Sequence, residues 1–268
     1  MKRLAVALAA VSMAAVSVVA TAAAPAGAAV AGKTTVFAAN AFSYAGGHPF
    51  GGTFCVNGTA ISSDVSTEQV DGPLIVDSGE ANVLFYDASN ATCGDEPVTA
   101  QLTTELPDGG SVTLMAYWGN DGHAVVMLTN PLDCVDPGMG RLTVRNGADS
   151  KGGAVDIYGE IDGVSTLLLS DIVSGSQGTV DLPVGTYSNV YASETGTLNL
   201  VTPMDDISIV ADSGAYAYTY GGNDGAPGAF TANPAELDAC TVPTTVAPTT
   251  TAPPAAAAAV QATPAFTG

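Results

Sequence analysis

The sequence predicts an all-β protein made of two tandem antiparallel β-sandwich domains with immunoglobulin-like proportions. Short apolar runs alternate with polar residues at a period of two, and clusters of Gly, Asn, Asp and Pro separate these runs. Such alternation is typical of strands that bury one face. A third observation gives the domain number: the phrase YWGNDG at 117–122 returns as YGGNDG at 220–225, 103 positions later. A period this long indicates two domains rather than a solenoid of short repeats.

The chain begins with a pattern typical of a secretory signal peptide. Lys2 and Arg3 precede an apolar run from Leu4 to Ala20, and Ala-x-Ala patterns follow it. The apolar run approaches the roughly 18 residues that a membrane-spanning helix needs, so a retained anchor is the alternative interpretation. The small residues favour removal, and we expect residues 1–31 to be cleaved after Ala31.

Text flanking the repeated phrase sets the expected domain bounds. Asn130-Pro131 follows the first phrase at the spacing at which Asn233-Pro234 follows the second, and Cys134 and Cys240 come shortly after these pairs. The beginnings of the two copies match more loosely. We therefore expect one sandwich over 33–138 and the other over 139–240, each with about seven short strands.

Two strands show the alternation most clearly and supply a candidate binding face. In SVTLMAYW, one face holds Val112, Leu114, Ala116 and Trp118, and the other holds Thr113, Met115 and Tyr117. In GAYAYTYG, three tyrosines lie opposite Ala215, Ala217 and Thr219. Exposed aromatic side chains would support ligand binding, and the alternative is core or cross-strand packing. The candidate binding residues are Tyr117, Trp118, Tyr216, Tyr218 and Tyr220.

The repeated phrase itself predicts a hairpin turn in each domain. Asn120-Asp121-Gly122 and Asn223-Asp224-Gly225 follow alternating strands, and these residue types tolerate the positive φ of tight turns. Asn57-Gly58 predicts a further hairpin turn for the same reason. A calcium site is the alternative, but each phrase offers a single carboxylate and Ca²⁺ takes several oxygen ligands.

Both copies resemble a known family, most specifically over residues 140–192. The stretches GRLTVRNGADSKGGAVDIYGEIDG and GTVDLPVGTYSNVYAS are similar to the bacterial secreted family catalogued as domain of unknown function 4397. The matching segments are Val144–Asn146 with Ala148-Asp149, then Val155–Tyr158, and then Leu182–Tyr187. The histidine and prolines of the family's first motif are missing here. The resemblance implies tandem β-sandwiches at the cell surface with no established activity, and motifs that act as fold determinants.

Four cysteines in an exported chain favour two disulfides. Three connectivities are open. Cys55 and Cys93 have no counterparts in the second copy, so pairing them with each other is the simplest choice, and Cys134 with Cys240 then follows by elimination. No Cys-x-x-Cys spacing occurs, which argues against a zinc site.

Charge and residue content narrow the function. The net charge of −20 becomes about −22 once Lys2 and Arg3 are removed, so phosphate backbones and anionic membranes should be repelled. Neither His48 nor His123 accompanies a nucleophile motif. We expect no enzyme activity, no catalytic residues, no cofactor or metal, no nucleic acid and no membrane insertion of the mature chain.

Residues 241–268 are rich in Thr, Pro and Ala and carry no charge, which is typical of a disordered stalk. Their end, Pro264–Gly268, looks like a sortase signal, except that proline replaces leucine and no hydrophobic stretch follows. The sequence thus predicts a secreted or cell-surface, non-enzymatic protein, structural or adhesin-like, whose partner is a surface ligand or envelope component. The alternatives are a calcium-stabilised module for carbohydrate or peptide and, with less support, a hydrolase.

Overall fold

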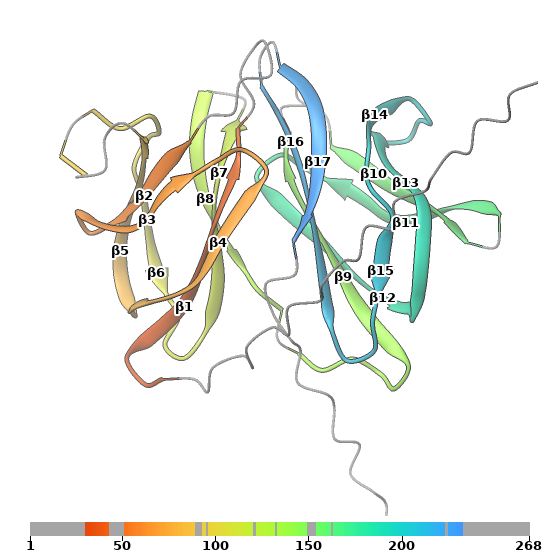
Figure 1. Cartoon of the computed structure of the whole chain (residues 1–268), viewed down its shortest axis with the longest axis horizontal. Coiled ribbons are helices and arrows are strands. Elements are labelled where there is room, and N and C mark those ends of the chain that lie inside the picture. Colours follow the sequence, from red (N-terminus) through yellow and green to blue (C-terminus); the bar gives the residue numbers. More distant parts are fainter. Residues whose placement is uncertain are drawn as a thin grey trace, which may run out of the picture.

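Two β-sandwiches lie side by side in the computed structural model (Figure 1). The structure describes residues 30–42, 51–88, 93–94, 96–119, 122–131, 133–148, 154–161, 163–222 and 225–232. Every regular element in these residues is a strand, which confirms the all-β prediction. The expected signal peptide, apart from its last two residues, and the whole expected stalk lie outside the described residues.

The first sandwich consists of two four-stranded sheets, with orders β4-β1-β7-β8 and β3-β2-β5-β6. β1 pairs with β7 in parallel, and the other pairs are antiparallel. The strands are β1 Lys33–Ala41, β2 Gly52–Val56, β3 Thr59–Val65, β4 Gln69–Asp77, β5 Gly79–Asp87, β6 Leu102–Leu106, β7 Ser111–Gly119 and β8 Gly122–Thr129.

The second sandwich repeats this arrangement with the sheets β12-β9-β16-β17 and β11-β10-β13-β14. β9 pairs with β16 in parallel, as β1 does with β7, and the short additional strand β15 pairs with β13. The strands are β9 Met139–Gly147, β10 Val155–Ile161, β11 Val164–Ile172, β12 Ser176–Pro183, β13 Gly185–Glu194, β14 Leu200–Pro203, β15 Ile207–Ile209, β16 Gly214–Gly222 and β17 Gly225–Ala232.

A buried asparagine at one position of each copy shows the duplication in atomic detail. The side-chain amide of Asn40 donates to the carbonyl of Val65, and that of Asn146 donates to the carbonyl of Ile172, both at 2.8 Å. Each asparagine also accepts a hydrogen bond from the backbone N–H two residues later. The same side chain thus ties the same two strands together in both sandwiches, and burial makes its hydrogen bonds obligatory.

Local sequence explains several turns. Asn57 and Gly58 have φ of 50° and 75° between β2 and β3, which confirms the Asn-Gly hairpin turn. At the β12–β13 corner, the hydroxyl of Tyr187 donates to the carbonyl of Pro183 at 2.9 Å. The Tyr187 ring is buried, so the Leu-Pro-x-Gly-Thr-Tyr motif is a turn that leads into the half-buried strand β13.

Each sandwich has its own apolar core between its two sheets. Val112, Leu114 and Ala116 point into the first core, and Ala215 and Ala217 point into the second. A third cluster joins the two sandwiches and contains Ala39, Ala41, Met115, Leu128, Tyr216, Tyr218 and Phe230. The predicted alternation is therefore confirmed in β7 and β16, and both strands bury both of their faces.

Candidate functional site

The aromatic face predicted from the sequence is largely the interface between the sandwiches. Tyr216 and Tyr218 are 1% and 0% exposed, and both belong to the joining cluster. The hydroxyl of Tyr220 donates to the carboxylate of Glu68 in the other sandwich. Tyr117 is partly buried against the same cluster. The binding-face interpretation is wrong for Tyr216 and Tyr218, because their rings pack between the sheets.

Arg145 lies at the centre of this interface and is fully buried. Its guanidinium donates to the hydroxyls of Thr113 and Tyr218, both at 2.7 Å. It also donates to the side-chain oxygens of Asn130 and, at 3.1 Å, Gln177. Thr113 and Asn130 belong to the first sandwich, so one side chain connects the two domains.

Aromatic rings complete the environment of this guanidinium. Its central carbon lies 4.8 Å from the Tyr216 ring centroid and 5.4 Å from that of Tyr218. Burial raises the pKa of both tyrosines, although the nearby positive charge acts in the opposite direction. The rings therefore stay neutral and offer their faces to the cation.

Equivalent positions of the two copies carry different side chains at this interface. Strand pairing makes Ala39 the equivalent of Arg145, and Thr113 and Met115 the equivalents of Tyr216 and Tyr218. The second sandwich carries the larger side chain at each of these three positions, and Met115 and Leu128 of the first sandwich also pack in the joining cluster. Side chains of unequal size at equivalent positions allow two related sheets to interdigitate.

The remaining predicted aromatic residue, Trp118, is partly buried against the core of the first sandwich. His123 lies beside it, with ring centroids 4.2 Å apart and an edge-on geometry. The Nδ1 of His123 is 3.2 Å from the Val98 carbonyl. Trp118 therefore packs in the structure instead of forming a binding face. His48 lies outside the described residues.

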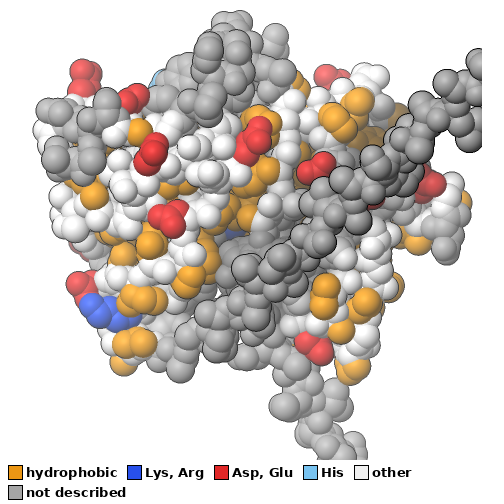
Figure 2. Space-filling view, viewed as in Figure 1, with side chains coloured by type: hydrophobic (Ala, Val, Ile, Leu, Met, Phe, Trp, Pro, Cys, Tyr) orange, Lys and Arg blue, Asp and Glu red, His pale blue; other side chains and the backbone are white. Residues whose placement is uncertain are grey.

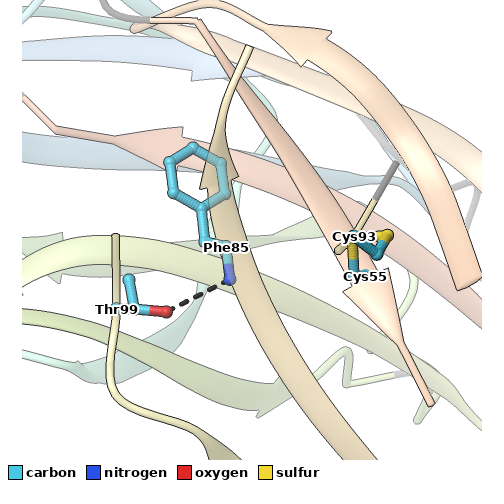
Figure 3. The surroundings of a disulfide bond; sticks show 4 residues. All are labelled: Cys55, Phe85, Cys93 and Thr99. Carbon is cyan, nitrogen blue, oxygen red and sulfur yellow. Dashed lines mark hydrogen bonds between the residues drawn. A yellow bond between two sulfur atoms is a disulfide. The ribbon is translucent and has the colours of Figure 1, made fainter. Parts of the chain in front are cut away.

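The Cys55–Cys93 disulfide is present and joins β2 to the segment between β5 and β6 (Figure 3). Nearby, the hydroxyl of Thr99 accepts a hydrogen bond from the N–H of Phe85, which fixes this segment against β5. Cys134 is also disulfide-bonded. Cys240 lies outside the described residues, so the pairing of Cys134 with Cys240 stays a prediction.

The two repeated turn phrases fall partly outside the described residues, which exclude 120–121 and 223–224. Gly119 pairs with Gly122 at the end of the β7–β8 hairpin. Within the described part of the chain, no group of three or more His, Cys, Asp or Glu side chains could hold a metal ion. The described residues also contain no helix long and apolar enough to cross a membrane.

Sequence reasoning missed an apolar stripe on the outer face of the sheet β11-β10-β13-β14. Tyr158 on β10 pairs with Leu167 on one side and Tyr191 on the other, and Tyr191 pairs with Pro203 on β14. Paired residues point to the same face of a sheet. We call Leu167, Tyr158, Tyr191 and Pro203 the tyrosine stripe. The available signal was the pair of tyrosines in VDIYGE and SNVYAS.

The stripe runs beside a buried carboxylate that stabilises the sheet. Asp156, 4% exposed, accepts hydrogen bonds from the backbone N–H groups of Asp171 and Gly196, both at 2.9 Å, and from the Thr195 hydroxyl at 3.3 Å. Burial alone would raise the pKa of Asp156, but these hydrogen bonds outweigh it and lower the pKa below its usual value. Asp156 thus serves the fold, and the tyrosines beside it remain as the candidate functional surface.

Comparisons with known proteins add little to this geometry. No family model matches the chain, and no curated protein matches it. A leucine-rich repeat protein from Bacteroides thetaiotaomicron is a structural match over 69% of this chain, with 13% sequence identity and a TM-score of 0.21. The match covers 25% of that longer chain.

Proposed function

We propose that the protein is a secreted or cell-surface, non-enzymatic binding module of the adhesin type, in which two sandwiches form one rigid body. The observation that carries this proposal is that the protein has two aromatic sheet faces, of which one is buried and the other is partly exposed. One face is buried with Arg145 at the interface, and the tyrosine stripe lies on an outer sheet of the resulting unit. A rigid body that carries an amphipathic sheet face can display that face to a surface ligand.

Other features support the separate parts of this proposal. The leader pattern and the Cys55–Cys93 disulfide favour export, since disulfides persist in oxidising compartments. Arg145 and Asp156, which have the most unusual surroundings, direct their hydrogen bonds at groups that hold strands and domains together. Buried polar groups whose hydrogen bonds are used in this way favour structural roles over catalytic ones.

The surface charge restricts the class of partner. Acidic side chains are scattered over the face shown in Figure 2, and basic ones are rare there. With a net charge of −20, the protein should bind uncharged or basic envelope components and not nucleic acid.

Cell fractionation with a binding assay tests the proposal. Full-length protein produced in a bacterium that secretes it should appear in the medium or be removed from intact cells by added protease. Purified protein should sediment with insoluble cell-envelope material, and a chelator should leave this binding unchanged. Retention of the protein in the cytoplasm, or no sedimentation with envelopes, would contradict the proposal.

A further inference from the structure

The tyrosine stripe crosses all four strands of its sheet. Leu167 on β11 is 48% exposed, Pro203 on β14 is exposed, and the two tyrosines between them are partly exposed. The Tyr158 and Tyr191 rings lie nearly parallel, with 10° between their planes and centroids 5.3 Å apart. The stripe is therefore a continuous apolar band perpendicular to the strands.

A hydrogen bond holds the Tyr191 side chain across the sheet. The Tyr191 hydroxyl is 3.2 Å from the hydroxyl of Ser165, which lies on β11, two strands away from β13. To reach Ser165, the Tyr191 ring must extend over β10. The Tyr191 side chain is therefore held across the strand that carries Tyr158, with the two rings stacked.

A polar row runs along one side of the stripe. Glu160 pairs with Ser165 on β11 and with Ser188 on β13. The Asn189 amide donates to the Glu160 carboxylate, so both side chains are oriented at the surface. Apolar rings flanked by oriented carboxylate, amide and hydroxyl groups match a pyranose, whose ring carbons present an apolar face and whose rim carries hydroxyls.

The position in the first sandwich that is equivalent to Tyr158 is buried. Pairing registers make Cys55 and Leu84 the equivalents of Tyr158 and Tyr191. Cys55 is 1% exposed and is cross-linked to Cys93, which belongs to the connection between β5 and β6. The corresponding connection in the second sandwich spans only residues 195–199. The first sandwich therefore buries this sheet position, whereas the second sandwich presents two partly exposed tyrosine rings there.

Charge decides between the candidate occupants. A second copy of the chain would bring another −20 charges to the surface, and an anionic glycan would meet Glu160 as well as that field. An uncharged sugar chain loses nothing to this repulsion, and it can use Glu160 and Asn189 as hydrogen-bonding partners.

We propose that the tyrosine stripe binds a neutral polysaccharide, which lies across the strands with its sugar rings on Tyr158 and Tyr191. This inference rests on the proposed binding function and specifies its ligand class. Leu167 and Pro203 extend the contact at the two ends of the stripe, and the polar row contacts the hydroxyls along one edge of the sugar chain.

Affinity electrophoresis and calorimetry with the full chain test the proposal, using soluble uncharged β-glucan, mannan and dextran as probes and dextran sulfate and polygalacturonate as anionic counterparts. We expect at least one neutral glycan to bind and the anionic ones not to bind. Tyr158→Ala and Tyr191→Ala should each weaken that binding by about tenfold, because each removes one stacking surface.

Two variants separate ligand contact from sheet stability. Tyr191→Phe keeps the ring and should retain most of the binding, while Leu84→Ala, at the equivalent position of the first sandwich, should leave binding unchanged. Thermal melts of every variant check the fold. Equal binding by wild type and both alanine variants, a preference for anionic glycans, or no binding to any neutral probe would overturn the proposal. Envelope sedimentation without neutral-glycan binding would overturn this inference alone and leave the proposed function standing.

Discussion

At the scale of single residues, Asp156 shows how a buried charge becomes a fold determinant. Its carboxylate accepts three hydrogen bonds from β11 and from the turn after β13, so it joins neighbouring strands of one sheet. The equivalent position in the first sandwich is Thr53, a buried hydroxyl for which the described residues supply no hydrogen-bond partner. The second sandwich therefore depends on ionisation at this position and the first does not.

This difference predicts a specific pH dependence. The folded-state pKa of Asp156 is lowered, so its stabilising contribution is complete above the unfolded-state pKa of about 3.9 and is lost as the pH falls through the folded-state pKa. Asp156→Asn cannot accept all three hydrogen bonds, and we expect it to lower the free energy of unfolding by about 1–3 kcal/mol at pH 7. Denaturant titrations from pH 7 to 2.5 should show this gap shrinking below pH 4. A gap that stays constant with pH would contradict the assigned role.

Residue patterns predict which side chains share a face of a strand, but not what that face contacts. The period of two correctly assigns the tyrosines of β16 to one face and the alanines to the other. It cannot say whether that face meets solvent or another sheet, because burial against a second domain depends on a surface far away in sequence. Arg145 escaped notice for the same reason, since its partners Thr113 and Asn130 lie in the other copy.

At the scale of elements, the strands that alternate cleanly were predicted well and irregular connections were not. β-branched residues are frequent over 98–104 (VTAQLTT), but the strand there is β6 at Leu102–Leu106, and Val98 and Thr99 lie in the connection before it. Val98 donates its N–H to the Phe85 carbonyl, and the Thr99 side chain accepts from the Phe85 N–H. A side chain thus replaces a backbone group in the ladder, which strand propensity cannot anticipate.

The Cys55–Cys93 disulfide fixes that irregular connection, and its removal should be costly. The two cysteines are separated by 38 residues, for which loop-closure entropy gives about 4 kcal/mol of stabilisation. The double variant Cys55→Ala/Cys93→Ala should lower the free energy of unfolding by about that amount in guanidinium titrations. Leu84→Ala removes side-chain volume beside Cys55 and keeps the cross-link. It therefore measures the loss of stability that comes from packing alone. A loss in the double variant no larger than that of Leu84→Ala would show that the connection is held by its other contacts.

At the scale of the whole molecule, the excess of acidic residues helps to explain how the buried cation of Arg145 is tolerated. None of the hydrogen bonds described above joins Arg145 to a carboxylate. Arg145 donates to four neutral groups, whereas Arg141 forms a two-pronged pair with Asp181 at 2.7 and 3.1 Å. Desolvation of a guanidinium is expensive, but hydrogen bonds, two aromatic faces and the field of a strongly acidic protein all offset it. The interface is therefore polar at its centre and apolar around it.

That arrangement predicts that the two sandwiches unfold together and that Arg145 couples them. Arg145→Met keeps much of the volume but removes the hydrogen bonds that the guanidinium donates to Thr113, Asn130, Gln177 and Tyr218, so we expect a loss of about 3–5 kcal/mol. Calorimetry should show one transition for the wild type and two separated transitions for the variant, since each sandwich retains its own core.

Lys33→Met is the matched control, because Lys33 pairs with Asp77 at the surface and its loss should cost less than about 1 kcal/mol. If Arg145→Met instead unfolds in a single transition at nearly the wild-type temperature, the apolar contacts of Met115, Leu128 and Phe230 hold the sandwiches together by themselves. The two results differ in what they imply for function. Coupling through one buried cation makes the rigid presentation of the tyrosine stripe depend on a single residue, whereas coupling through apolar area distributes it over the whole interface.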